Sequence, residues 1–194
     1  MNIQAIETRR SIRRFKADQV PEAALRQILE AARIAPSSRN GQTWKFLVLG
    51  PESRERALGA MDRGIREKME NGGSRQTLAG AAHTLRIKKS APALIFVVNP
   101  ETGPMLAPIE GMPHAMELLD TVSVGAAVEN MILEAETLGI GSLWIGFTIV
   151  AYDEIVEALG IDGQLLCAVA LGYPDEHPDA RPRKPFEEIV EWMP

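Results

Sequence analysis

The sequence is poor in cysteine, in aromatic residues and in long apolar segments. Its single cysteine, Cys167, rules out an intrachain disulfide, and the apolar residues around it indicate a small core residue. No uninterrupted apolar run approaches the roughly 20 residues that span a bilayer, and the N-terminus is charged within its first ten residues. We therefore expect a soluble cytoplasmic protein with no membrane partner.

Basic residues are also fewer than acidic residues over the whole chain. The sequence holds 21 Lys and Arg against 26 Asp and Glu, a formal net charge of −5. An acidic protein of this kind is a poor candidate for broad nucleic-acid binding. With 194 residues, of which 45% are hydrophobic, the chain can bury one core, and we expect a single domain over residues 1–194.

The sequence lacks several motifs of protein-based catalysis. It has no dinucleotide-binding Gly-x-Gly-x-x-Gly after a strand, no Walker loop, no Gly-x-Ser-x-Gly elbow and no His-Glu-x-x-His. His83, His114 and His177 are far apart and have no cysteine or carboxylate at metal-ligand spacing. We predict no metal site and surface positions for the three histidines. Paired-carboxylate catalysis stays open, although Asp120 and Glu129 lie on a buried helix pattern without an evident partner, and structural hydrogen bonding explains them as well.

Hydrophobic periodicity predicts a mixed fold of helices and strands. Residues 2–7, 21–34, 51–70, 76–87 and 152–159 show helical patterns, and residues 45–49, 93–98, 142–147 and 165–171 read as strands. Leu58, Met61, Ile65 and Met69 share one helical face and predict a buried stripe. Residues 99–113 hold four prolines and two glycines without periodicity, so we expect a loop that covers a site as a lid.

The segment 118–138 is the longest helical candidate and has almost no polar face. A helix that is apolar nearly all round is buried on all sides. In a chain of this size a second subunit is the simplest cover, and Gly125, Ala126 and Ala127 would allow close approach. We therefore predict a homodimer.

A polar loop, residues 36–42, lies between a helix end and a strand. Ser37, Ser38, Asn40 and Gln42 offer donors and acceptors at close spacing, which suits a flat group with polar edges. An ordinary capped turn explains the same residues.

Two clusters of basic residues lie near opposite ends of the chain. Residues 9–14 contain four arginines and Ser11, and residues 181–185 contain two arginines and a lysine. Arginine presents a planar fork of donors that matches phosphate oxygens. Solvated charged faces would look similar, but together with the polar loop the clusters favour a nucleotide-like cofactor with a terminal phosphate.

Six motifs in order along the chain resemble the nitroreductase family of FMN-dependent oxidoreductases. They are Arg9-Arg10-Ser11-Ile12-Arg13-x-Phe15, Pro36-Ser37-Ser38-x-Asn40-x-Gln42-x-Trp44-x-Phe46, the helix 120–139, Gly139-Ile140-Gly141-Ser142-x-Trp144-Ile145-Gly146-Phe147, Leu171-Gly172-Tyr173-Pro174 and Arg181-x-Arg183-Lys184-Pro185. Thr43 and Ile145 depart from the family pattern, which usually has a proline and, in some members, an acidic residue at these positions.

The resemblance implies an α+β fold with a central, mainly antiparallel sheet flanked by helices, and a dimer with a long buried interface helix. Both subunits would build each of two FMN sites. The implied cofactor-binding residues are Arg9, Arg10, Ser11, Arg13, Arg181 and Arg183 of one subunit, Pro36, Ser37, Ser38, Asn40 and Gln42 of the other, and Ile145 and Gly146. The backbone N–H of Gly146 would point toward flavin N5, and Arg13 would favour the reduced flavin, which is anionic along its N1–C2 edge.

The implied activity is hydride transfer from NAD(P)H through flavin N5 to a nitroaromatic, a quinone or a similar small acceptor. The flavin would perform this redox step, so the resemblance implies no catalytic side chain. A flavin-binding redox sensor or storage module is the alternative from another class. A dehalogenase or a flavin-cleaving enzyme on the same scaffold, or a dimerisation scaffold without cofactor, are further alternatives.

Overall fold

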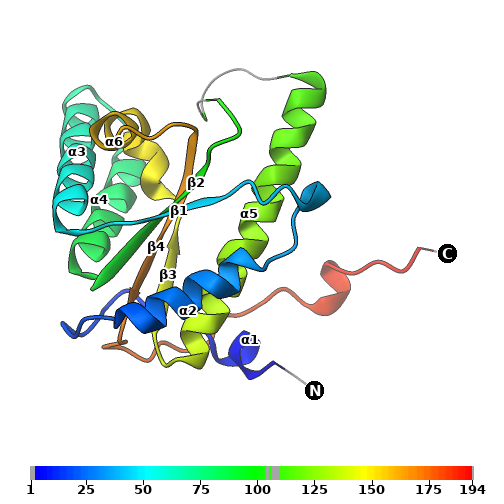
Figure 1. The fold of residues 1–194 in the computed structure, drawn as a ribbon. Coiled ribbons are helices and arrows are strands. Elements are labelled where there is room, and N and C mark those ends of the chain that lie inside the picture. The colour runs from blue at the N-terminus through cyan, green and yellow to red at the C-terminus, as the bar shows by residue number, and fades with distance from the viewer. Residues whose placement is uncertain (1–2, 104, 106–109, 194) are drawn as a thin grey trace.

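The structure is a computed structural model that describes residues 3–103, 105 and 110–193. Within these residues, β1 (Lys45–Val48), β2 (Ala93–Asn99), β3 (Gly141–Ile145) and β4 (Gln164–Gly172) form one sheet in the order β1-β2-β4-β3 (Figure 1). Every neighbouring pair is antiparallel. The predicted antiparallel sheet and its four strands are confirmed.

Helices cover both faces of this sheet. They are α1 (Gln4–Thr8), α2 (Glu22–Arg33), α3 (Pro51–Glu70), α4 (Arg75–Ser90), α5 (Gly111–Thr137) and α6 (Tyr152–Leu159), with short 3-10 helices η1 (Ser38–Asn40), η2 (Phe147–Ala151) and η3 (Phe186–Glu188). Figure 1 shows α3, α4 and α6 on one side of the sheet and α2 and α5 on the other. The fold is therefore an α+β arrangement of three layers.

Two hydrophobic cores form because strand side chains alternate between the faces. Leu94, Phe96 and Val98 of β2 belong to the core under α3, α4 and α6. Ile95 and Val97 belong to the core under α2 and α5. Cys167 is buried in that second core, as predicted.

Three expected boundaries or burials were wrong. α5 begins at Gly111 rather than at residue 118, and it takes in Pro113 because the first turn of a helix needs no intrahelical acceptor for its N–H groups. α4 extends to Arg75–Ser90, with the Ser74 hydroxyl accepting a hydrogen bond from Thr77 N. Met61 is buried but Met69 is exposed, since α3 runs past the edge of the core there. Part of the expected lid, residues 104 and 106–109, lies outside the described residues.

The single chain buries the long helix only in part, and the cover predicted from a second subunit stays a prediction. Val124, Val128 and Met131 are buried in the core. In contrast, Leu118 is 53% exposed, Leu119 is 48% exposed and Val122 is 73% exposed. One apolar flank of α5 is therefore left exposed by the residues that the structure describes.

The two ends of the chain lie side by side at the edge strand β3. Ile12 N donates to Ser142 O at 2.9 Å, and Lys16 N donates to Tyr173 O at 2.9 Å just after β4. From there the C-terminal segment runs over the outside of the molecule and away from it (Figure 1). No helix in the described ranges has both the length and the hydropathy needed to cross a membrane.

Candidate functional site

The two basic clusters meet in one pocket of about 320 Å³, which we call the cationic pocket. Its lining includes all six basic or hydroxyl residues predicted for one subunit: Arg9, Arg10, Ser11, Arg13, Arg181 and Arg183. Residues 178–180 and the end of α1 complete the wall. The structure thus brings together residues that are more than 160 positions apart in the chain.

A second pocket of about 540 Å³, the apolar pocket, adjoins the first through Arg13, which lines both. One wall comes from β3 and η2 and includes Trp144, Gly146 and Phe147. The other wall comes from α4 and consists of Gly80, His83, Thr84 and Ile87. The sequence interpretation missed the α4 wall. The one sequence feature that could have indicated it is that positions 80, 83, 84 and 87 share one helical face.

The outer backbone edge of β3, on the side away from β4, is bonded to the N-terminal segment at Ser142, whose O accepts from Ile12 N at 2.9 Å. Period-2 alternation directs the backbone groups of Trp144 to the same side. Gly146 follows the end of β3 with φ −85° and ψ −10°, and its carbonyl oxygen accepts a hydrogen bond from Ile149 N at 3.4 Å. A Cβ added to Gly146 would meet no atom within 4 Å, so space is open beside it. Ile145 is buried in the core under α3, α4 and α6 and is also among the residues that line the apolar pocket.

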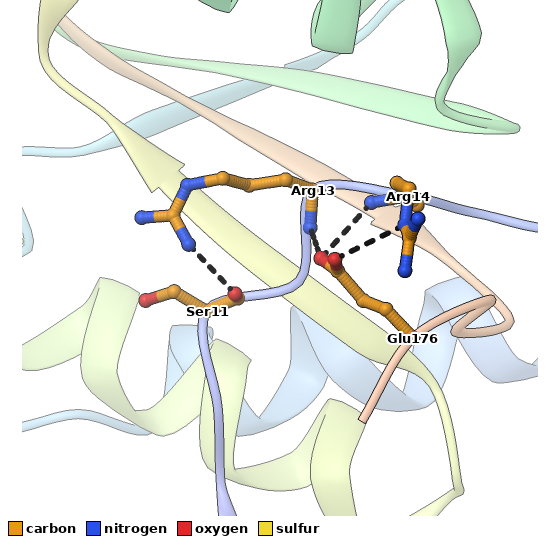
Figure 2. A network of polar contacts seen from close by, with 4 residues as sticks. All are labelled: Ser11, Arg13, Arg14 and Glu176. Carbon is orange, nitrogen blue, oxygen red and sulfur yellow. Dashed lines mark hydrogen bonds and ion pairs between the residues drawn. The ribbon is translucent and has the colours of Figure 1, made fainter. Parts of the chain in front are cut away.

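A carboxylate from the C-terminal segment fixes the backbone of the arginine segment. Figure 2 shows Glu176 facing the backbone nitrogens of Arg13 and Arg14. Both N–H groups donate to Glu176 Oε1, and Arg14 Nε lies 3.3 Å from Glu176 Oε2. The Arg13 guanidinium in turn donates to Ser11 O at 3.0 Å. The sequence analysis did not single out Glu176, because nothing in the local pattern marks it as a partner of residues 13 and 14.

The Glu176 carboxylate is charged at neutral pH. Burial opposes its ionisation, but the backbone hydrogen bonds from Arg13 and Arg14 and the positive charges of both arginines outweigh that effect. The pKa of Glu176 is therefore lower than its ordinary value of 4.5. Its contribution to stability is complete above that value and is lost as the pH falls through the lowered pKa.

Arg10 has a structural role beside its place in the cationic pocket. Its guanidinium donates to the carbonyl oxygens of Glu7, Thr8 and Arg9 at 2.8, 3.1 and 2.8 Å. These carbonyls end α1 and have no intrahelical donors. Arg10 therefore ties α1 to the wall of the pocket.

The polar loop lies apart from both pockets of its own chain. Ser38 N donates to Ser123 Oγ on α5 at 3.0 Å, and Gln42 N donates to Ser37 Oγ at 3.0 Å. Arg39, Asn40 and Gln42 have φ values of 53°, 55° and 51°, a left-handed backbone conformation that residues other than glycine rarely adopt. The loop is thus held in a strained, specific shape on α5, and Pro36, Ser37, Ser38, Asn40 and Gln42 do not line either pocket.

No metal-binding geometry accompanies these pockets. Among the described residues, no group of three or more His, Cys, Asp or Glu side chains could hold a metal ion. His83, His114 and His177 are all exposed, as predicted, and His83 lines the apolar pocket.

The fold and the paired pockets define a class of protein: an α+β protein whose edge strand carries an apolar pocket beside a cluster of arginines. Residues 6–173 match the family described as the Nitroreductase family. The match covers most of the chain. This chain belongs to the nitroreductase family, which confirms the family and the oxidoreductase class expected from the sequence.

Individual relatives agree with this assignment. A Bacillus subtilis (strain 168) protein named as a candidate NAD(P)H nitroreductase, YfhC, is 28% identical over 94% of this chain and 89% of its own length. An Archaeoglobus fulgidus protein named as a candidate NADH dehydrogenase/NAD(P)H nitroreductase is 30% identical over 91% of this chain and 87% of its own. A Desulfovibrio desulfuricans protein, solved as a crystal structure in complex with FMN, is 29% identical with a TM-score of 0.74 and covers 99% of this chain and 96% of its own.

Proposed function

We propose that this protein is an FMN-dependent NAD(P)H oxidoreductase that reduces a nitroaromatic, a quinone or a similar small acceptor. The observation that carries the proposal is the junction of the cationic pocket with the apolar pocket at Arg13. FMN has the matching two-part chemistry, a dianionic phosphate joined to a flat heterocycle. Relatives named as NAD(P)H nitroreductases and a neighbour solved with FMN support this choice.

The residues of the cationic pocket fit a phosphate group. Within the described part of the chain, Arg13, Arg181 and Arg183 form no ion pair with a carboxylate. Arg13 gives one N–H to Ser11 O, and its remaining donors can meet a phosphate. Arg9 and Ser11 would add a guanidinium and a hydroxyl from the other side of the pocket. Charge-assisted bonds of this kind are about twice as strong as neutral hydrogen bonds.

The apolar pocket fits the ring system. Trp144 and Phe147 supply aromatic walls, and the free N–H of Gly146 would meet the ring at N5 while leaving one face open. Arg13 would lie beside the N1–C2 edge and stabilise negative charge there. Bound flavin supplies the hydride chemistry, and the protein binds it, orients it and keeps water from its covered face.

We further propose a homodimer in which each FMN is completed by the polar loop of the partner subunit. Two observations support this. The apolar flank of α5 at Leu118, Leu119 and Val122 is exposed among the described residues, and residues 36–42 are held in shape without lining either pocket of their own chain. We also propose that residues 1–194 form a single FMN-binding domain and that the protein acts in the cytoplasm.

The absorption spectrum of the purified, dialysed protein tests the cofactor, and anaerobic addition of NADPH or NADH to the same sample tests the donor. We expect a flavin spectrum that bleaches on addition. A colourless protein that does not take up added FMN would refute the proposal.

Steady turnover of NADPH with an added quinone separates an enzyme from a redox sensor, because a sensor would hold reduced flavin without rapid reoxidation by the quinone.

Replacing Gly125 with leucine should disrupt the dimer. A Cβ added at this position would lie 3.8 Å from the Trp144 ring, an ordinary contact that alanine can make. The further carbons of leucine would occupy space on the face of α5 that the proposed partner approaches. We expect the dimer dissociation constant to rise about tenfold or more, measured by sedimentation or by size-exclusion chromatography with light scattering. Gly125→Ala is the matched control and should stay dimeric. A folded Gly125→Leu variant that remains dimeric at the same concentrations would contradict the α5 interface.

A further inference from the structure

We propose that Glu176 is a positioning residue that holds the two arginine segments of the cationic pocket in register for the phosphate of the cofactor. This inference rests on the proposed function, since the phosphate is that of FMN. Glu176 does not line the cationic pocket itself. It acts through the backbone of Arg13 and through the C-terminal segment that leads to Arg181 and Arg183.

The first half of the argument concerns the N-terminal segment. Two consecutive backbone N–H groups, those of Arg13 and Arg14, converge on one carboxylate oxygen of Glu176 (Figure 2). This fixes the backbone at the residue whose side chain lines both pockets. The same residue directs its guanidinium back to Ser11 O. The position of the Arg13 charge therefore depends on the Glu176 carboxylate.

The second half concerns the C-terminal segment. Asp175 N donates to Arg14 O at 3.0 Å, so residues 175 and 176 are tied to residues 13 and 14 from both directions. In the described ranges, residues 177–184 make no backbone hydrogen bond to another segment. Glu176 is thus the last hydrogen-bonded anchor before Arg181 and Arg183. Without the Glu176 contact, the hydrogen bond from Asp175 N to Arg14 O is left as the anchor, and phosphate binding would have to order a longer and more weakly tied segment.

The backbone contacts, rather than the ion pair, give Glu176 this role. The Arg14 side chain is 72% exposed and that of Glu176 is 18% exposed. An ion pair to so exposed a guanidinium contributes little, whereas two backbone hydrogen bonds to one partly buried carboxylate are costlier to lose. Removing the Arg14 side chain should therefore matter much less than removing that of Glu176.

Positioning and simple electrostatics predict opposite signs for the loss of Glu176. Deleting a negative charge beside a cluster of arginines makes the pocket more positive, which by itself would tighten the binding of an anionic phosphate. Loss of positioning would weaken it. The direction of the change in FMN affinity therefore distinguishes the two roles.

The experiment measures FMN affinity by fluorescence titration of apoprotein prepared from wild type, Glu176→Ala, Glu176→Gln and Arg14→Gln. We expect affinity to fall about tenfold or more in Glu176→Ala. Glu176→Gln, which keeps one acceptor oxygen, should recover part of that loss. Arg14→Gln should stay within about twofold of wild type. Equal or tighter FMN binding by a folded Glu176→Ala variant would overturn the proposal.

Hydrogen exchange in the FMN-free proteins gives a readout that does not depend on the cofactor. The amides of Arg13 and Arg14 should exchange faster in Glu176→Ala than in wild type, while amides of β2 and β4 should be unchanged. If wild type fails to bind FMN but this difference appears, the proposed function fails and the positioning contact stands. If FMN binds and the exchange rates do not differ, the positioning role is refuted.

Discussion

Replacing Arg13 with alanine is expected to weaken FMN binding about tenfold or more and to make the bound flavin harder to reduce. Both effects have one cause, since Arg13 is the residue shared by the cationic and the apolar pockets. Its guanidinium would bind FMN from the side of the cationic pocket and would also stabilise the negative charge that develops on the flavin ring on reduction. The midpoint potential should fall by roughly 30 mV or more, equivalent to about 1.4 kcal/mol.

Arg13→Lys is the informative control. Lysine keeps the charge but loses the planar fork of donors, so the potential should stay near that of wild type while affinity falls in part. Spectroelectrochemical titration of both variants measures the potential directly. An unchanged potential in Arg13→Ala would remove Arg13 from the ring-binding role assigned to it.

Replacing Lys88 with methionine is expected to stabilise the protein by about 1 to 3 kcal/mol at pH 7. Lys88 is fully buried, and its Nζ lies 3.4 Å from the Sδ atom of Met61. In the described part of the chain it forms no ion pair with a carboxylate. A flexible apolar side chain of similar length would fill the same space without placing a charge in the core.

The pH dependence of stability provides a second test at this position. Burial lowers the pKa of Lys88 from its ordinary value of 10.5 to about 7. Between these values the unfolded chain binds more protons than the folded one, so the free energy of unfolding rises with pH across this window. The rise should be absent from Lys88→Met. Urea unfolding at pH 7 and pH 9, at fixed protein concentration, measures both effects.

Lys89 offers a matched control on the same helix. Its side chain is about half exposed, and its Nζ lies 3.9 Å from Asp62 Oδ2. Lys89→Met should change the free energy of unfolding by less than about 0.5 kcal/mol. A Lys88→Met variant that is less stable than wild type at pH 7 would show that the buried amine is favourably solvated in the folded protein.

The secondary structure was largely predictable because local periodicity reports it. The four strands are short apolar runs bounded by turn residues, and the helices at residues 22–33 and 152–159 show clear amphipathic spacing. The start of α5 was missed because the helix already begins at Gly111 and includes Pro113 in its first turn. The sequence interpretation took this proline as the end of a loop. Lys88 was missed because a charged residue ordinarily lies outside the core, yet it continues the buried stripe Leu78, Ala81 and Leu85 of α4.

The sequence by itself determined which residue types are available for chemistry and their order along the chain. It marked both arginine clusters and the polar loop, because donors suited to phosphate and to a heterocycle are recognisable as residue types. The glycine after β3 came only from the family resemblance. Only the tertiary structure decided which of them meet. Ile12 pairing with Ser142, and Glu176 binding the backbone of Arg13 and Arg14, bring the two ends of the chain to one edge strand. These contacts join residues 130 and more positions apart, and no local pattern encodes such long-range pairing.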